Sequence, residues 1–274
     1  MARQVAAKGI RGLFGPLLAL VFPDDCRVCG EALNTVSRIP VCNGCLREPQ
    51  PQHAEYACST CRMPFVNSFP LDEAGRCSLC RLGLLNFGAV YTYGSYEGTL
   101  RTLVHLLKFE RIHTLARPLS ALMLRVLPRE QRFDFIVPVP LHWRRRRQRG
   151  FNQAELLAKE IARRWNAPVA HALRRTRATA PQSGLTNAKR RANLRGAFVP
   201  ASKFAKGALR GARVLLVDDV ITTGASAAAC AAVLKRAGAA HVAVAAVART
   251  DRRLALPEFV LSPALSTAGA GGNS

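Results

Sequence analysis

Residues 214–226 constrain the fold of this chain more than any other stretch. They begin with four apolar residues that predict a buried strand, continue with Asp218 and Asp219 where we expect that strand to end, and finish in a Thr-Thr-Gly turn. Residues 225–237 then have the composition of a helix, and Gly238 is suited to end it. Such strand–turn–helix units build α/β sheets. We therefore expect a mostly parallel sheet flanked by helices.

The same turn has the chemistry of a site for a sugar phosphate. Backbone N–H groups and the helix dipole attract an anion at a helix N-terminus, and Gly224 lets the backbone come close to it. Hydroxyl donors follow at Thr222, Thr223 and Ser226. Two carboxylates suit sugar hydroxyls, or a divalent metal that accompanies a phosphate. A ribose phosphate with Mg²⁺ meets both requirements.

Residues 214–226 resemble the phosphoribosyl-pyrophosphate (PRPP) motif of type I phosphoribosyltransferases. The resemblance implies that Asp218 and Asp219 hold the ribose hydroxyls and form the catalytic pair. It also implies a PRPP-binding loop made of Val220, Thr222, Thr223, Gly224, Ala225 and Ser226. A Walker B strand is one alternative, but the chain contains no G-x-x-x-x-G-K-[ST] sequence. A strand–helix turn without a ligand is the other alternative.

Eight of the nine cysteines fall into four Cys-x-x-Cys pairs near the N-terminus. Two residues between thiolates let both sulfurs reach one tetrahedral ion, so the pairs predict two structural Zn²⁺ sites, or one if the other is degenerate. A redox role would need a thioredoxin-like context that the sequence lacks. The proposed metal ligands are Cys26, Cys29, Cys42, Cys45, Cys58, Cys61, Cys77 and Cys80.

The sharing of these pairs between two ions is open at the sequence level. Sequential sharing gives a double zinc ribbon, whereas interleaved sharing gives a cross-brace. The short, regular intervals favour sequential sharing. The ninth cysteine, Cys230, lies within the alanine-rich helix and is expected in the core.

The order of patterns along the chain predicts four segments. We expect a lead helix over 1–22, a double zinc ribbon over 23–83, a phosphoribosyltransferase-like domain over 84–250 and a disordered tail over 251–274. In the third segment we expect strands at 87–93, 133–140, 169–173 and 241–247, and helices at 100–109, 113–127 and 152–165. The lead helix is too short to span a bilayer, so we expect a cytoplasmic protein, with peripheral membrane contact as the minor alternative.

Other loops are predicted to join the site because ligands in parallel sheets bind at the carboxyl ends of the strands. The turn of Pro138, Val139 and Pro140 offers the N–H of Val139, and Arg149 follows it in a basic loop. Lys108 ends an apolar helix and could reach a phosphate, unless it is a solvated surface lysine. A flexible basic loop carries Lys189, Arg190, Arg191 and Arg195.

The net charge of +23, from 40 Lys and Arg against 17 Asp and Glu, indicates a polyanionic partner such as nucleic acid. A generally arginine-rich surface is the alternative. Trp143, Phe151 and Trp165 lie in or beside the basic stretch. They are candidates for stacking on single-stranded bases, although such residues more often pack in cores.

The combination of cysteine pairs with Val-Pro-Val-Pro-Leu, Arg-Gly-Phe-Asn-Gln-Ala and Lys-Arg-Arg-Ala-Asn-Leu-Arg-Gly-Ala-Phe closely resembles the ComF/GntX family. The resemblance implies PRPP and Mg²⁺ binding, and a role in bringing single-stranded DNA into the cytosol with DNA-uptake or recombination proteins. No hood insertion for an acceptor is evident, so the chain is either an enzyme with an unnamed acceptor or a non-catalytic adaptor. A transcription regulator that senses PRPP is disfavoured because no helix-turn-helix is present.

Overall fold

A four-stranded parallel sheet forms the centre of the computed structural model. The structure describes residues 24–33, 37–52, 54–65, 67–177, 194, 196–205 and 207–250. The sheet has the strand order β3-β8-β7-β4, and every neighbouring pair is parallel. Its strands are β3 (Ala89–Ser95), β4 (Phe135–Pro138), β7 (Arg213–Ile221) and β8 (His241–Arg249). The α/β fold class expected from the sequence is confirmed.

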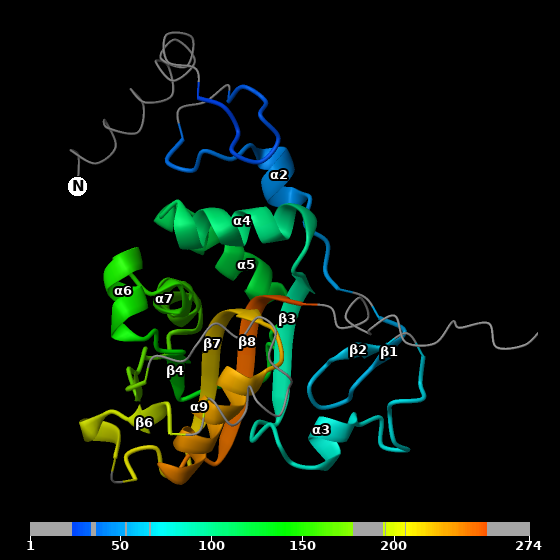
Figure 1. The fold of residues 1–274 in the computed structure, drawn as a ribbon, viewed down its shortest axis with the longest axis vertical. Coiled ribbons are helices and arrows are strands. Elements are labelled where there is room, and N and C mark those ends of the chain that lie inside the picture. The colour runs from blue at the N-terminus through cyan, green and yellow to red at the C-terminus, as the bar shows by residue number, and fades with distance from the viewer. Residues whose placement is uncertain are drawn as a thin grey trace, which may run out of the picture.

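Helices cover both faces of this sheet because its central strands are apolar on both sides. Val214 and Leu216 of β7 pack in the same cluster as α9 (Ala225–Arg236). Leu215 and Val217 point to the opposite face, which packs on α4 (Gly98–Phe109), α5 (Ala116–Val126) and α7 (Gln153–Trp165). Figure 1 shows α9 in front of β7 and β8. Alternation along β7 therefore assigns each side chain to one of two cores.

Strand β7 is longer than predicted. Its pairing with β8 continues past the acid pair, through Val220↔Ala248 to Ile221↔Arg249. The prediction that the strand ends at Asp218 and Asp219 is therefore wrong. Because β8 also runs beyond its predicted end to Arg249, the ladder carries both strands to a common edge.

The basic stretch after β4 is a helix rather than the predicted loop. Helix α6 (Trp143–Arg149) is capped at its N-terminus by His142, whose Nδ1 accepts a hydrogen bond of 3.3 Å from the N–H of Arg144. Gly150, with φ +82°, caps its C-terminus. The arginines favour a helix because straight side chains lose little freedom there. Asn152 then caps α7, the helix predicted at 152–165, and its Oδ1 accepts from the N–H of Ala154 at 3.1 Å.

The predicted strand at 169–173 is also wrong in most of its length. Only Val169 forms a bridge, to Ile136. The chain instead forms a two-stranded antiparallel ribbon of β5 (Leu173–Arg175) and β6 (Phe198–Pro200). A 3₁₀ turn, η1 (His113–Leu115), precedes α5 where one helix was predicted, and η2 (Ser202–Phe204) follows β6.

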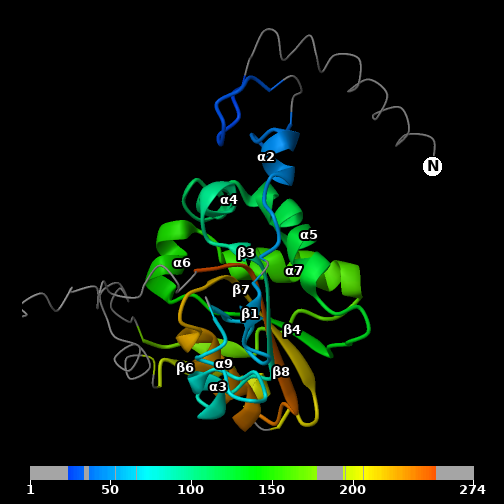
Figure 2. The ribbon, with the colours of Figure 1, turned by 90° about the vertical axis from the view of Figure 1, so that its right-hand side faces the viewer.

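The cysteine-rich segment has little regular structure. It contains α2 (Asn43–Arg47), the two-residue strands β1 (Tyr56–Ala57) and β2 (Pro64–Phe65), and α3 (Ser78–Arg81). In Figures 1 and 2, α2 stands beyond α4, away from the sheet, whereas β1, β2 and α3 lie alongside the sheet. Gly30 has φ +79° between the first two cysteine pairs, and Gly44 lies inside α2.

Three predicted segments lie outside the described residues: the lead helix, the tail, and the flexible loop with Lys189, Arg190, Arg191 and Arg195. Within the described ranges, no helix combines the length and the apolar character that a membrane span requires.

Candidate active site and metal groups

The acid pair lies at the carboxyl edge of the sheet, with its two side chains on opposite faces. Asp219 points toward α4, where its Oδ1 lies 2.9 Å from the Nζ of Lys108. Both side chains are largely buried, at 6% and 13% exposure. The second oxygen of Asp219, Oδ2, is buried and has no hydrogen-bond partner in the described part of the chain. Asp219 therefore keeps one acceptor available beside its ion pair.

Asp218 faces the other side of β7 and is electrostatically different. Its Oδ1 accepts a hydrogen bond of 2.9 Å from the N–H of Asp219. Burial, followed by the negative charge of Asp219, raises the pKa of Asp218 to about 7, against opposing effects from Lys108 and Arg175. Asp218 therefore exchanges its proton near neutral pH, and a cationic ligand would favour its ionised form.

The turn after β7 has the geometry of an anion-binding helix start. Gly224 has φ +75° and caps α9, so the left-handed conformation is built into the turn. The hydroxyl of Thr223 accepts from the N–H of Ala225 at 3.3 Å. Thr222 is exposed, and Thr223 and Ser226 are half-buried. The N-terminus of α9 and these hydroxyls therefore belong to one turn.

The turn after β4 differs from its predicted role. Pro138 is the last residue of β4, and the N–H of Val139 donates to the carbonyl of Val217 at 2.9 Å. Val139 therefore extends the sheet, and this N–H is not available to a diphosphate. The buried side chain of Asn152 holds the turn, since its Nδ2 donates to the carbonyl of Val139 at 3.0 Å.

Two arginines supply positive charge near the acids. Arg149, at the end of α6, has its guanidinium 4.9 Å from the centre of the Phe109 ring. Burial lowers the pKa of Arg149, and the charges of Asp219 and Asp218 oppose that change. Arg175 of β5 behaves in the same way: burial lowers its pKa, and Asp218 opposes the change. Sequence reasoning selected Arg149 and missed Arg175, which stands in a strand that it did not place.

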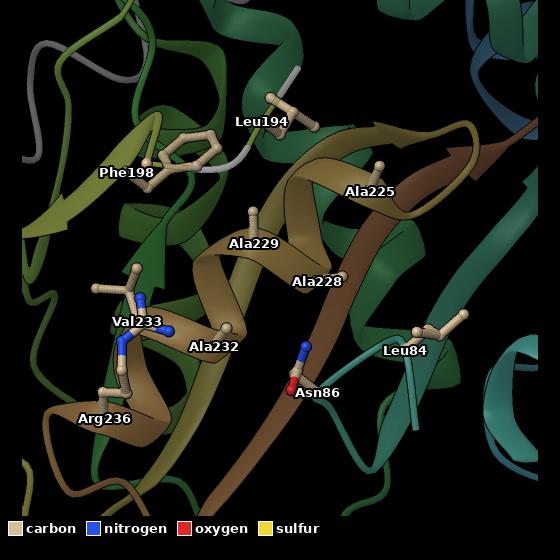
Figure 3. A pocket seen from close by; sticks show the side chains of 11 residues that line it. Leu84, Asn86, Leu194, Phe198, Ala225, Ala228, Ala229, Ala232, Val233 and Arg236 are labelled. Atoms are coloured by element: carbon tan, nitrogen blue, oxygen red, sulfur yellow. The ribbon is translucent and has the colours of Figure 1, made fainter. Parts of the chain in front are cut away.

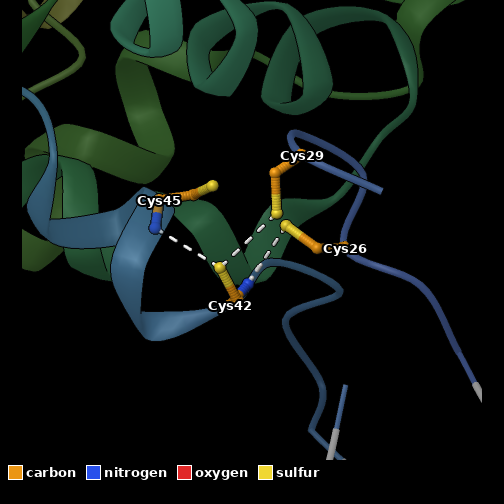
Figure 4. Close-up of side chains that lie close together, drawn as sticks. All are labelled: Cys26, Cys29, Cys42 and Cys45. Carbon is orange, nitrogen blue, oxygen red and sulfur yellow. Dashed lines mark hydrogen bonds between the residues drawn. The ribbon is translucent and has the colours of Figure 1, made fainter. Parts of the chain in front are cut away.

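The eight paired cysteines form two groups of four. Cys26, Cys29, Cys42 and Cys45 make the first, and Cys58, Cys61, Cys77 and Cys80 the second. Sequential sharing is therefore confirmed. Figure 4 shows the first group converging from two knuckles, with the sulfurs of Cys29 and Cys42 3.9 Å apart.

The donor set and spacing fit a tetrahedral zinc–thiolate centre. In the second group, sulfur–sulfur distances are 3.6 Å for Cys58–Cys80 and 3.7 Å for Cys61–Cys77. Four sulfurs at zinc–sulfur bond length around one ion are about 3.8 Å apart. Backbone N–H groups of Cys61 and Cys77 also donate to the sulfur of Cys58, at 3.5 and 3.3 Å. Such bonds stabilise a thiolate.

The crowding of these sulfurs perturbs their ionisation. A hydrogen bond from the thiol of Cys61 lowers the pKa of Cys77 to about 5, and the same contact raises the pKa of Cys61. One thiolate is thus present near neutral pH even without an ion, and a divalent metal would favour ionisation of the others.

A hollow of about 360 Å³ runs along α9 from Ala225 to Arg236, and neither Asp218 nor Asp219 is among the residues that line it. Figure 3 shows the small side chains of α9 forming its floor, with Leu84 and Asn86 at one side and Phe198 at the other. Arg236 lies at the end of the hollow away from Ala225. Its apolar floor does not resemble a phosphate site.

Comparison with known proteins identifies the relationship of the chain. Residues 151–263 match the model of the phosphoribosyl transferase domain. The chain is 33% identical over 245 residues to the DNA utilization protein YhgH of Escherichia coli strain K12, covering 84% of this chain and 99% of that protein. It is 30% identical over 208 residues to competence protein F of Haemophilus influenzae, covering 70% of this chain and 90% of that protein. The chain belongs to the ComF/GntX family.

A solved structure with a similar fold is the glutamine PRPP amidotransferase from B. subtilis complexed with ADP and GMP. It is 21% identical, has a TM-score of 0.34, and the match covers 48% of this chain and 26% of that one.

In this ComF/GntX-family chain a second arginine also escaped sequence reasoning. Arg249, at the end of β8, is only 2% exposed, and its Nη1 donates to the carbonyl of Cys61 at 2.6 Å. One signal in the sequence could have identified Arg249. It ends an apolar strand, and the ends of parallel strands lie at the edge of the sheet where ligands bind. The contact itself joins residues 188 positions apart, so no local pattern predicts it.

Proposed function

We propose that this protein binds PRPP with Mg²⁺ at the carboxyl edge of the sheet and acts in the uptake of single-stranded DNA into the cytosol. The observation that carries the first part is the buried Oδ2 of Asp219, which has no hydrogen-bond partner among the described residues and belongs to the strand that leads into the left-handed helix start at Gly224. A buried acceptor without a donor is costly, and a ribose hydroxyl would satisfy it.

Each side chain then has a role in holding the ligand. Lys108 fixes Asp219 through its 2.9 Å ion pair, and Asp218 accepts from ribose in its ionised form. The turn from Thr222 to Ser226 receives the 5′-phosphate at the N-terminus of α9. Arg149 and Arg175 supply charge for the diphosphate. The Mg²⁺ that accompanies PRPP would neutralise negative charge on the leaving diphosphate.

Transfer would break the bond between ribose C1 and the diphosphate and form a bond from C1 to the acceptor. Fixed cations stabilise the charge that develops on the diphosphate. An acceptor that is already nucleophilic requires no protein base. Release of pyrophosphate from PRPP, with bases, nucleotides and single-stranded DNA offered in turn, would distinguish an enzyme from a PRPP-binding adaptor.

Calorimetric titration with PRPP and Mg²⁺ tests the binding site. We expect Asp219→Asn to weaken binding by about tenfold or more, because a charge-assisted hydrogen bond is worth about 1.5–3 kcal/mol. Asp218→Asn should weaken it too, whereas the exposed Glu130→Gln should bind as the unaltered chain does. Failure of the unaltered chain to bind, or unchanged affinity in both Asp variants, would remove the proposal.

An exposed aromatic on α6 supports the DNA part of the proposal. Trp143 is 55% exposed, and the guanidinium groups of Arg144 and Arg147 lie 5.3 and 5.6 Å from its ring centre. The other two candidate aromatics are used in packing: Phe151 contacts His113, and Trp165 stacks on Phe133 at 5.5 Å. An aromatic flanked by cations suits stacking on single-stranded bases.

A salt series of single-stranded DNA binding tests this surface. We expect the logarithm of affinity to fall linearly with the logarithm of salt concentration, since bound phosphates release counterions. Trp143→Ala should weaken binding by about 1–3 kcal/mol. Arg144→Ala should reduce the slope by about one, whereas Arg164→Ala, an exposed arginine on α7, should not. An affinity for single-stranded DNA that does not change with salt concentration would contradict the proposal.

A further inference from the structure

The two cysteine groups occupy different environments. In the second group, Cys58, Cys61 and Cys77 are buried in the same cluster as α9 and β7. In the first group Cys29 is exposed, whereas Cys26 and Cys45 are buried in the other cluster, which contains α4 and α5. The first segment is anchored by Thr114, whose hydroxyl donates to the carbonyl of Arg38 at 2.8 Å. The second group alone is built into the face of the sheet that carries α9.

Arg249 joins the second group to the sheet. Its side chain is buried and donates to the carbonyl of Cys61, itself one of the four cysteines. Burial of a cation is costly unless negative charge lies nearby. Four thiolates around one Zn²⁺ would carry a net charge of about −2, which would favour a buried cation beside this group. The hydrogen bond from Arg249 to Cys61 also ties the end of β8 to the backbone that carries Cys58 and Cys61.

The backbone of Arg249 reaches the phosphate turn. It pairs in register with Ile221, the residue immediately before Thr222, and the N–H of Thr250 donates to the carbonyl of Ile221 at 3.0 Å. The other end of the turn, at Gly224, contacts the segment that follows the second cysteine group. Side-chain atoms of Leu85 and Phe87, which follow Cys80 of the second group, lie 3.9 Å from the position of a Cβ built on Gly224. One end of the turn thus pairs with Arg249, which binds the second cysteine group, and the other end contacts residues that follow that group.

We propose that the second cysteine group, through Arg249, is a positioning element for the phosphate turn, and that metal loss there, but not at the first group, disorders the turn. Arg249 acts through the backbone at Ile221 and does not touch the ligand. The consequence for PRPP affinity rests on the proposed function. The consequence for the turn itself does not, because it can be measured without a ligand.

Amide hydrogen exchange of the peptide that contains residues 221–226, measured on the full chain together with zinc content, tests the proposal. We expect Cys80→Ser to lose one zinc and to exchange at least about tenfold faster in this peptide, because local opening determines exchange. Cys29→Ser should also lose one zinc but exchange within about twofold of the unaltered chain. Arg249→Met should resemble Cys80→Ser in the turn, and Arg249→Lys, which keeps the charge, should restore part of the protection.

A spectroscopic arm covers the case in which Cys80→Ser does not fold. With Co²⁺ loaded in place of zinc, Arg249→Met should alter the thiolate–cobalt bands, whereas Arg164→Met should not. The proposal would be overturned if the hydrogen-exchange rate of residues 221–226 stayed unchanged in Arg249→Met. It would also be overturned if that rate rose as much in Cys29→Ser as in Cys80→Ser. Titration with PRPP and Mg²⁺ tests the proposed function separately. If the unaltered chain binds no PRPP, the proposed function fails, but the exchange data still decide whether the second cysteine group positions the turn.

Discussion

Asp218 and Asp219 are neighbours in the chain but experience different environments because β7 continues through them. Alternation along a strand sends adjacent side chains to opposite faces. Asp219 meets Lys108 of α4, whereas Asp218 has a pKa raised by burial and by the charge of its neighbour. The adjacent acids therefore differ: Asp219 forms an ion pair with Lys108, whereas the pKa of Asp218 is raised to about 7.

The raised pKa of Asp218 predicts a pH-dependent stability difference. The pKa of about 7 in the folded chain exceeds the ordinary value. Ionisation therefore opposes folding: its cost is absent below about pH 4, grows with rising pH, and is complete above about pH 7. Asp218→Asn removes the titration, so its stability relative to the unaltered chain should rise by about 1 kcal/mol between pH 6 and pH 8. Urea unfolding at both pH values measures this, and a constant difference would contradict the assignment.

Removal of Lys108 should be costly because it leaves Asp219 buried and unpaired. We expect Lys108→Met to destabilise the chain by about 3 kcal/mol, and Asp219→Asn in the same chain to recover part of the loss. The ion pair of Lys159 and Glu155 is the matched control because its lysine is 56% exposed, so Lys159→Met should cost less than about 1 kcal/mol. Equal losses for the two lysines in urea unfolding would show that burial does not set the cost.

At the scale of elements, the turn between β7 and α9 is the best predicted part of the chain. The turn at Gly224 and the start of α9 fall where local patterns indicate them, whereas β7 runs past the acid pair at which it was predicted to end. Helix α6 was predicted as a loop, because six polar residues in a row carry no apolar periodicity to mark a helix. Its helical form depends on caps at His142 and Gly150.

Gly224→Ala tests the turn as a unit. An added Cβ at φ +75° should cost about 1 kcal/mol of stability. Gly207→Ala is the matched control, because Gly207 has φ +73° but no heavy atom within 4 Å of an added Cβ. Both variants should lose similar stability in thermal unfolding, but only Gly224→Ala should also weaken the binding of PRPP with Mg²⁺. Equal affinities would place the phosphate elsewhere.

At the scale of the molecule, the pairing of cysteines predicts how metal is lost. Replacement of both Cys26 and Cys42 by Ser should leave one zinc per chain, because both belong to the first group. The same double change would remove both ions if the pairs were interleaved, since each ion would then lose a ligand. Metal analysis of the purified chain gives the count directly, with two zinc ions expected before substitution.

The sequence by itself determined the local units: the strand–acid–turn–helix unit, the four cysteine knuckles and the cap of α7. Each depends on residues a few positions apart, whose chemistry dictates backbone geometry directly. Only the tertiary structure decided that Asp219 pairs with Lys108, that the N–H of Val139 is consumed by Val217, and that Arg249 reaches Cys61. Those contacts join distant residues, and strand register and helix packing, which no local pattern encodes, bring them together.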